Sequence, residues 1–293
     1  MSRDRVYVCQ APNRRPQEFR RLLPVNHKEN RNHSAPLFSA PSTYARLVQR
    51  VLGGVPLSQA LPFLDDLVIH SRDVNGHLEA MRNVFTAYQN AGLRLNPLKC
   101  HLIKESVTYL GHSVSKDGLS PCKDYIQVIE KWPIPRTRSQ LRAWIGKIGY
   151  YRKFIEGFAA LANPLLTMLG KDTGLKDHEE YQVTKPMEQS FEALKRKLIE
   201  APILAYPRFD DLDRHPFILS TDWSADNNAI GGVLSQMQEN RERVISYAAR
   251  RLNSTQSHYS ATKGELCALL IMMQIWADFL IHHKFQNLAA KGG

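Results

Sequence analysis

Several stretches of the chain carry apolar residues every three or four positions, with polar residues between them, as amphipathic helices do. In residues 187–199, one such stripe is formed by Met187, Phe191, Leu194 and Leu198. The same spacing occurs in residues 76–91, 137–155 and 262–282, and Gly53-Gly54 would end a further helix over residues 41–52. Each of these stretches is predicted to form a helix.

Proline and a capping pattern predict where the helix in residues 137–155 begins. Pro133 and Pro135 mark a boundary in front of it. Thr137 and Gln140 then form a capping box, in which each side chain satisfies a backbone donor of the other residue. The helix presents one apolar face, made of Leu141, Trp144, Ile145, Ile148, Tyr151 and Ile155.

The last predicted helix, residues 262–282, combines an apolar face with one acid. Glu265 lies at the edge of that face, one turn before Leu269. The face consists of Leu266, Leu269, Leu270, Met273, Ala277 and Leu280. Gln274 and Asp278 interrupt the apolar stretch, which is shorter than a bilayer span requires. We therefore expect no membrane segment.

Strands are expected in two parts of the chain. Apolar runs on both sides of Asp65 and Asp66 predict a tight hairpin with the two acids at its turn. Residues 107–119 predict a second hairpin, with Asp117-Gly118 at its turn. Three later β-rich segments are joined by short connections, which predicts that they form an antiparallel meander. These segments are residues 217–222, 229–236 and 243–250.

Length and charge narrow the class of protein. A chain of 293 residues is long enough for two domains. Its 39 Lys and Arg outnumber 28 Asp and Glu, and the net charge of +11 suits a polyanionic partner such as nucleic acid. The four cysteines are scattered, which fits free thiols in a reducing compartment, and no secretory signal is visible. We expect an intracellular protein of the cytoplasm or nucleus.

Asp65 and Asp66 are the first candidate metal ligands. Two adjacent carboxylates in apolar surroundings are costly unless a cation neutralises them, and Mg²⁺ prefers such hard oxygens. The alternative is an acidic pair that caps a solvent-facing turn. Zinc is the less suitable metal, because the candidate ligands match no usual zinc spacing. Those candidates are Cys100, His101, His112 and Cys122.

The hairpin and its neighbours resemble reverse transcriptases of gypsy-type long-terminal-repeat retrotransposons. Phe63-Leu-Asp-Asp66 is similar to the aromatic-x-Asp-Asp catalytic hairpin of that family. The other matching segments are residues 38–52, 92–100, 109–115 and 146–155. The resemblance implies that Asp65 and Asp66 are catalytic metal ligands with Mg²⁺ or Mn²⁺ as the cofactor. It implies a partial α+β reverse-transcriptase palm followed by a helical thumb and connection.

The same resemblance implies a set of residues that bind nucleic acid. Lys99 would lie near the nucleotide phosphates, and Gly111 and His112 belong to the hairpin that positions the primer. Basic residues of the thumb helix would contact phosphates, which position nucleic acid without reading its sequence. These residues are Arg138, Arg142, Lys147 and Arg152. The alternative is an ordinary hairpin and a solvated amphipathic helix.

The later strands and the last helix resemble the opening half of ribonuclease H. Ser220-Thr-Asp-Trp-Ser224 stands where that family has Thr-Asp-Ala-Ser, and residues 247–252 and 259–266 also match. By this resemblance Asp222 and Glu265 are the first two metal ligands of a truncated α/β ribonuclease H-like domain. Without it, Asp222 is a strand-end cap and Glu265 a helix-surface acid.

Composition and resemblance together divide the chain into segments. Residues 1–34 are expected to be disordered or unrelated to the family, and 287–293 form a tail. Between them lie the partial palm, the thumb, connection and linker, and the ribonuclease H-like domain. Their expected bounds are 35–119, 120–186 and 187–286.

The catalytic sets are incomplete within these residues. No strand ending in the first polymerase aspartate is recognisable, and Asp4 is its candidate replacement. The third and fourth nuclease carboxylates and the last strands are expected to be absent. Asp278 cannot substitute, because it lies more than three turns beyond Glu265.

The implied function is that of a retrotransposon-derived RNA-directed DNA polymerase and ribonuclease H fragment. Such enzymes act by a two-metal mechanism on RNA templates, DNA primers, deoxynucleotides and RNA–DNA hybrids. We expect this chain itself to be inactive. The alternative is a catalytically dead remnant that binds nucleic acid.

Overall fold

The computed structural model describes residues 5–10, 40–63, 66–71, 73–95, 100–170, 174, 176–210, 212–281 and 285–289. They form two compact units, residues 1–116 and 117–293, with the boundary close to the end of the predicted palm. No helix among the described residues is long and apolar enough to cross a membrane.

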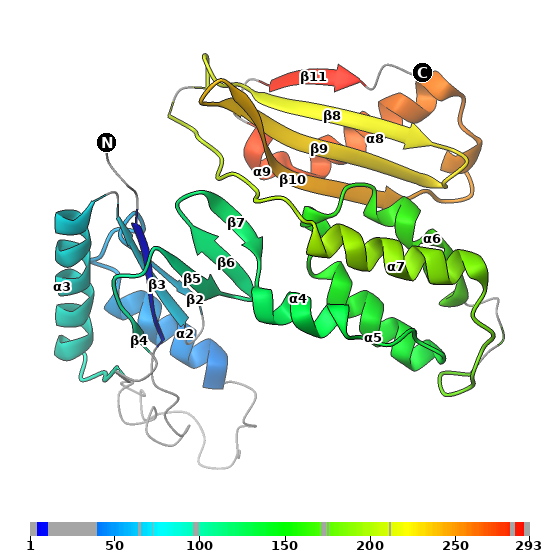
Figure 1. The fold of residues 1–293 in the computed structure, drawn as a ribbon. Helices are drawn as coiled ribbons and strands as arrows, with labels where there is room; N and C mark the ends of the chain where they lie inside the picture. The colour runs from blue at the N-terminus through cyan, green and yellow to red at the C-terminus, as the bar shows by residue number, and fades with distance from the viewer. Residues whose placement is uncertain are drawn as a thin grey trace, which may run out of the picture. The chain divides into compact units, whose positions relative to one another are not determined.

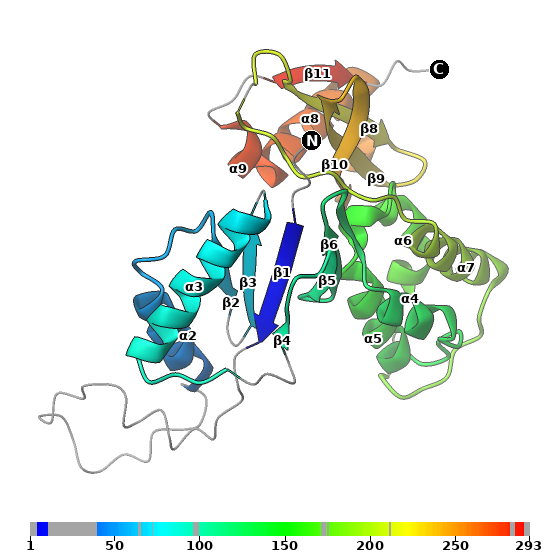
Figure 2. The same cartoon turned by 60° about the vertical axis from the view of Figure 1, so that its left-hand side comes forward.

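The first unit is built on a four-stranded antiparallel sheet of order β2-β3-β1-β4. Figure 2 shows β3 between β2 and β1. The strands are β1 (Arg5–Gln10), β2 (Ala60–Phe63), β3 (Asp66–Ser71) and β4 (Cys100–His101). The expectation that residues 1–34 are disordered is wrong for β1, and residues 11–34 lie outside the described part of the chain.

Helices α2 (Ala40–Val51) and α3 (Val74–Asn90) cover one face of this sheet. Leu67 and Ile69 of β3 face these helices and share a buried core with Val84 of α3. Val68, between the two, packs on the other side against Val107. β3 is therefore apolar on both faces, which explains its continuous hydrophobic run.

The segment predicted as one hairpin, residues 107–119, makes its first turn at Leu110-Gly111, before the predicted turn at Asp117-Gly118. Strands β5 (Ser106–Tyr109) and β6 (His112–Ser115) pair across Leu110 and Gly111, whose φ angles are 47° and 70°. Positive φ at both central positions is the geometry of a type I′ hairpin turn, which Gly111 adopts without strain. Asp117 lies between β6 and β7 (Gly118–Pro121) in the chain, and Gly118 is the first residue of β7.

The second unit combines a helical cluster with a sheet (Figure 1). The helices are α4 (Lys123–Glu130), α5 (Arg138–Gly149), η3 (Arg152–Phe154), α6 (Phe158–Met168) and α7 (Lys185–Ile199). Their shared core includes Leu141, Trp144, Ile148, Phe191 and Leu194. The predicted apolar stripes of residues 137–155 and 187–199 are thus confirmed as core.

The prediction of one continuous helix over residues 137–155 is wrong. Helix α5 ends at Gly149, and the chain turns through η3 before α6 begins, although Tyr151 and Ile155 remain buried. The capping box is also only half formed. Thr137 Oγ1 accepts from the Gln140 N–H at 3.2 Å, but Gln140 Oε1 accepts from the N–H of Arg136.

The sheet of the second unit has the order β10-β9-β8-β11. Its strands are β8 (Phe217–Ser224), β9 (Ala229–Gln238), β10 (Arg241–Arg251) and β11 (Phe285–Ala289). The first three form the predicted antiparallel meander. β11 lies parallel to β8, so the strand expected to be missing after Phe285 is present and covers the edge of β8.

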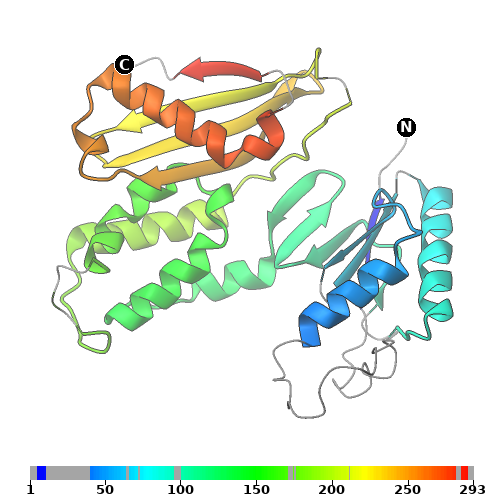
Figure 3. The same ribbon diagram turned by 180° about the vertical axis from the view of Figure 1, so that it is seen from behind.

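The last predicted helix is divided into α8 (Ala261–Ile275) and α9 (Ala277–Leu280), which lie on one face of the sheet (Figure 3). Ala268 and Met272 contact the sheet core, whereas Leu266 and Leu270 are 56% and 53% exposed. These two leucines belong to the predicted apolar face but lie outside the core, because the sheet contacts the neighbouring stripe of the helix.

Candidate functional site

The Asp65-Asp66 turn has the expected hairpin position. Phe63 at the end of β2 pairs with Asp66 at the start of β3, while Leu64 and Asp65 lie outside the described residues. Asp66 is partly exposed. The pKa of the Tyr109 hydroxyl is raised, first by burial and then by the charge of Asp66. Tyr109 is therefore a neighbour of the hairpin that the sequence reasoning did not identify.

Strand β1 lies beside the hairpin, where the resemblance implied a strand ending in an aspartate. Gln10, its last residue, is opposite Asp66, and the strand Arg-Val-Tyr-Val-Cys-Gln contains no acid. Asp4 lies outside the described residues, but its neighbour Arg5 pairs with Ser71 at the other end of β3.

Asp222 and Glu265 come together in the second unit. Residues of β8 alternate between the two faces of the sheet, so that Leu219 joins the core under α8 and Asp222 is exposed. Glu265, on the second turn of α8, is half-buried. Its carboxylate accepts a hydrogen bond from the backbone N–H of Trp223. The charge of Asp222 acts on Glu265, so the two acids are near each other in the fold, and their role as metal ligands stays a prediction.

The electrostatics of Glu265 are those of a carboxylate that lacks a counter-ion. Burial raises its pKa most, and the negative charge of Asp222 raises it further. Its Oε2 atom is buried and has no hydrogen-bond partner in the part of the chain that the structure describes. A buried charged oxygen without a partner is costly. A divalent cation fits this pair of hard oxygen ligands.

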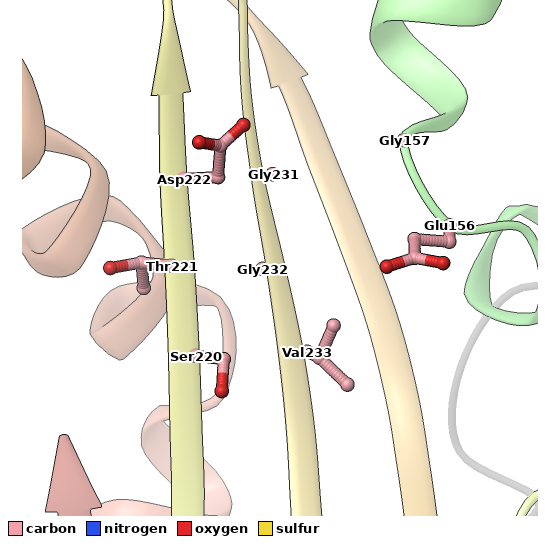
Figure 4. Close-up of a pocket in the computed structure, with 8 residues that line it drawn as sticks. All are labelled: Glu156, Gly157, Ser220, Thr221, Asp222, Gly231, Gly232 and Val233. Atoms are coloured by element: carbon pink, nitrogen blue, oxygen red, sulfur yellow. The ribbon is translucent and has the colours of Figure 1, made fainter. Parts of the chain in front are cut away.

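A hollow of about 240 Å³ opens beside Asp222 (Figure 4). Asp222 lies opposite Gly231 of β9, where a side chain would meet nothing within 4 Å. Glu156, which precedes α6, lines the other side of the hollow. Sequence reasoning missed Glu156, because no local pattern brings it to β8. The remaining lining residues are Gly157, Ser220, Thr221, Gly232 and Val233.

The described residues contain no cluster of three or more histidine, cysteine or acidic side chains around a single point. The zinc candidates Cys100, His101, His112 and Cys122 are therefore not gathered into a site. Asp222 and Glu265 are a partial ligand set, and a cation held by them would need further oxygens from water or substrate.

Three of the basic residues predicted to bind phosphates have partners within the second unit. Arg138 Nη2 donates to the carbonyls of Leu169 and Gly170, just after the end of α6, at 2.9 and 3.2 Å. Both outer nitrogens of Arg142 donate to Asp177, at 3.1 and 3.0 Å. These contacts fix the arrangement of the helices.

The third of these residues is Lys147, which donates to the Tyr125 hydroxyl at 3.3 Å and lies over the Tyr125 ring. Arg152, by contrast, is exposed. In the first unit, His112 is buried, with Nδ1 2.7 Å from the Leu110 carbonyl oxygen. Lys99 lies outside the described residues.

Two family models match the chain. Residues 37–114 match the reverse transcriptase (RNA-dependent DNA polymerase) family, and residues 183–287 match the RNase H-like domain found in reverse transcriptase. The two matches cover the candidate hairpin and the Asp222–Glu265 pair, respectively.

Curated relatives cover most of the chain. The retrovirus-related Pol polyprotein from transposon 297 of Drosophila melanogaster is 34% identical over 249 residues, which are 85% of this chain and 22% of the relative. The transposon Tf2-3 polyprotein of Schizosaccharomyces pombe is 28% identical over 83% of the chain and 17% of its own length. The chain thus spans about a fifth of the length of these relatives.

Solved structures share the fold. A foamy viral protease-reverse transcriptase in complex with double-stranded DNA superposes with a TM-score of 0.73 at 19% identity, over 86% of this chain and 50% of that protein. The same viral protein in complex with an RNA/DNA hybrid gives a TM-score of 0.71 over 85% of this chain and 32% of that one. The predicted fold class, a reverse-transcriptase palm, a helical thumb and a ribonuclease H-like domain, is confirmed.

Proposed function

From the premise that this chain carries the reverse transcriptase and RNase H-like segments of a retrotransposon Pol polyprotein, we propose a function for its second unit. Asp222 and Glu265 hold a divalent cation, Mg²⁺ or Mn²⁺, and are two ligands of the site with which the family cleaves the RNA strand of an RNA–DNA hybrid. With these two ligands alone we expect the 293-residue chain to bind the hybrid but not to cleave it. The observation that carries the proposal is the buried, unpartnered Oε2 of Glu265 beside Asp222.

Each residue of the site has a distinct role. Asp222 is exposed at the hollow, where it is accessible to a phosphate group and to water. The N–H of Trp223 orients the Glu265 carboxylate. Gly231 leaves the floor of the hollow open, which lets a nucleic-acid backbone approach the strand closely. A bound divalent cation would supply a Lewis acid for the phosphate and an activated water.

We propose RNA-directed DNA synthesis as the family function of the Asp65-Asp66 hairpin, with template, primer and deoxynucleotides as its substrates. The strand beside Asp66 ends in Gln10, and an amide is a weaker ligand for Mg²⁺ than a carboxylate. We therefore propose that the 293-residue chain does not extend primers by itself, since a two-metal mechanism needs further carboxylates.

A second candidate function is binding of nucleic acid without catalysis. The net charge of +11 favours it, as do the structural neighbours that are complexes with double-stranded DNA and with an RNA/DNA hybrid. Under this proposal the hybrid binds to the chain without any contribution from a cation held by Asp222 and Glu265.

Hybrid binding and cleavage can be measured in one experiment. A labelled RNA–DNA hybrid is titrated with the 293-residue chain in EDTA, Mg²⁺ and Mn²⁺ at two salt concentrations. We expect binding that weakens with salt and strengthens with Mn²⁺, and no cleavage products. The Mn²⁺ effect should disappear in D222N/E265Q and persist in the control D278N. Cleavage that depends on Asp222 would show that the chain is active, whereas a Mn²⁺ effect retained in D222N/E265Q would remove the proposed site.

A further inference from the structure

Trp223 and Gly264 are in direct contact between β8 and α8. A Cβ atom added to Gly264 would fall among the ring atoms of Trp223, only 2.8 Å from Cε3 and closer to two others. Gly264 is buried, and the backbone of α8 therefore rests directly on the indole ring. No larger residue fits at position 264 unless the ring or the helix moves.

The contact lies next to both candidate metal ligands. Trp223 follows Asp222 on β8, and Gly264 precedes Glu265 on α8. The backbone N–H of Trp223 also donates to the Glu265 carboxylate. The distance between α8 and β8 at this point therefore determines how closely Glu265 approaches Asp222.

Local structure explains neither the glycine at position 264 nor the large side chain at position 223. Glycine is a poor helix former, so a buried glycine inside α8 indicates a packing requirement. Among the described residues, the buried indole N–H of Trp223 has no hydrogen-bond partner, which is unfavourable for stability. At this position the ribonuclease H motif has alanine, a much smaller residue, in its Thr-Asp-Ala-Ser sequence.

We propose that Trp223 and Gly264 are a size-matched pair of positioning residues that sets the separation of the Asp222 and Glu265 carboxylates. The large ring on the strand is matched by the missing side chain on the helix. This inference rests on the proposed function, because it assumes that Asp222 and Glu265 bind a cation.

The test is a double-mutant cycle read by Mn²⁺ affinity and by melting temperature. The variants of the 293-residue chain are G264A, W223A, W223A/G264A and W223F. The control is G146A, because Gly146 is also a helical glycine but a Cβ there meets nothing within 4 Å. Far-UV circular dichroism establishes that each variant is folded at the temperature of the titration.

G264A should weaken Mn²⁺ binding about 10- to 100-fold, the usual effect of losing a residue that orients a metal ligand. W223A/G264A should recover most of this loss, because removal of the ring makes room for the added methyl group. W223F replaces the indole ring by a smaller one and should also weaken Mn²⁺ binding, because the smaller ring no longer fills the space left by Gly264. G146A should leave the Mn²⁺ affinity unchanged and raise the melting temperature slightly, because alanine is the better helix former and its Cβ meets no other atom there.

Two results would overturn the inference while leaving the proposed site intact. One is a G264A variant with a lower melting temperature but unchanged Mn²⁺ affinity, which would make the contact merely structural. The other is a double variant that binds no better than G264A, which would show that the two sizes are not matched. If the unmodified chain binds no Mn²⁺, the proposed function fails, and this inference fails with it.

Discussion

The negative charge of Asp222 on β8 raises the pKa of the Glu265 carboxyl on α8, in addition to the larger effect of burial. The two residues belong to different elements, and the packing of α8 on β8 brings them together. Both effects disfavour the charged form of Glu265, and a bound cation would reverse them.

The first prediction concerns the stability of the second unit without metal. The pKa of Glu265 is raised above its ordinary value of 4.5, so the folded state binds a proton more readily than the unfolded state. Protonated Glu265 therefore stabilises the folded state. This contribution is fully present below pH 4.5 and is lost as pH rises through the pKa of Glu265 in the folded state. At pH 7 in EDTA, E265Q should therefore melt at a higher temperature than the unmodified chain.

The same comparison in Mg²⁺ is the control for that prediction. The cation should raise the melting temperature of the unmodified chain and leave that of E265Q unchanged, because only the former retains both ligands. All four tryptophans lie in the second unit, so tryptophan fluorescence reports on this unit alone. An E265Q variant that melts lower in EDTA would contradict the electrostatic argument.

The second prediction concerns His77, which is 1% exposed in α3. Burial, and secondarily the charge of His70, lower its pKa from 6.5 to about 4. The unfolded state thus binds the proton first, and the first unit should lose stability as pH falls from 6.5 towards 4. Amide hydrogen exchange of α3 measures this loss.

A matched pair of variants separates His77 from other histidines. H77F should flatten the pH dependence of exchange in α3, because it removes the group that titrates. H101Q should leave it unchanged, since His101 is exposed. Equal slopes for H77F and the unmodified chain would assign the pH dependence to another group.

The third prediction separates structural from phosphate-binding arginines. R142Q loses a two-point ion pair with Asp177 but should leave hybrid affinity unchanged. R152Q should weaken hybrid binding and reduce the salt slope by about one, because Arg152 is exposed and available to a phosphate. Fluorescence anisotropy at several salt concentrations measures both. If R142Q alone reduces the slope, the assignment of the two arginines is reversed.

The fourth prediction concerns the helical core. Phe191 is 1% exposed and its ring centroid lies 4.6 Å from that of Trp144. F191A should lower the free energy of unfolding by about 3–5 kcal/mol, the usual cost of removing a buried aromatic ring. I203A, at a 51% exposed position, should change it by less than about 0.5 kcal/mol. Urea unfolding followed by tryptophan fluorescence distinguishes the two.

Sequence patterns predicted the elements whose signals are local. The stripe of α7 and the buried face of α5 follow from residue spacing, and the Asp65-Asp66 hairpin follows from its flanking apolar runs. The same spacing did not reveal the end of α5 at Gly149, because Tyr151 and Ile155 continue the apolar pattern after the chain has turned.

Other features depend on contacts between distant parts of the chain. Leu266 and Leu270 belong to the apolar face predicted from the sequence, but the sheet packs against the neighbouring stripe of α8 and leaves both exposed. Glu156 lines the hollow beside Asp222 through packing that no local pattern encodes. The contact of Gly264 with Trp223 is equally invisible in the sequence, although an unexplained glycine in a helix is a signal.

The central claim is that Asp222 and Glu265 are ligands of one divalent cation, and a Mn²⁺ titration of four chains tests it most directly. Electron paramagnetic resonance measures free Mn²⁺ with the unmodified chain, D222N, E265Q and D222N/E265Q, and D278N is the control. For a shared site, each single variant should lose most of the affinity, and the double variant should bind no more weakly than the poorer single variant. Affinity losses that are small and simply add in the double variant would contradict the claim.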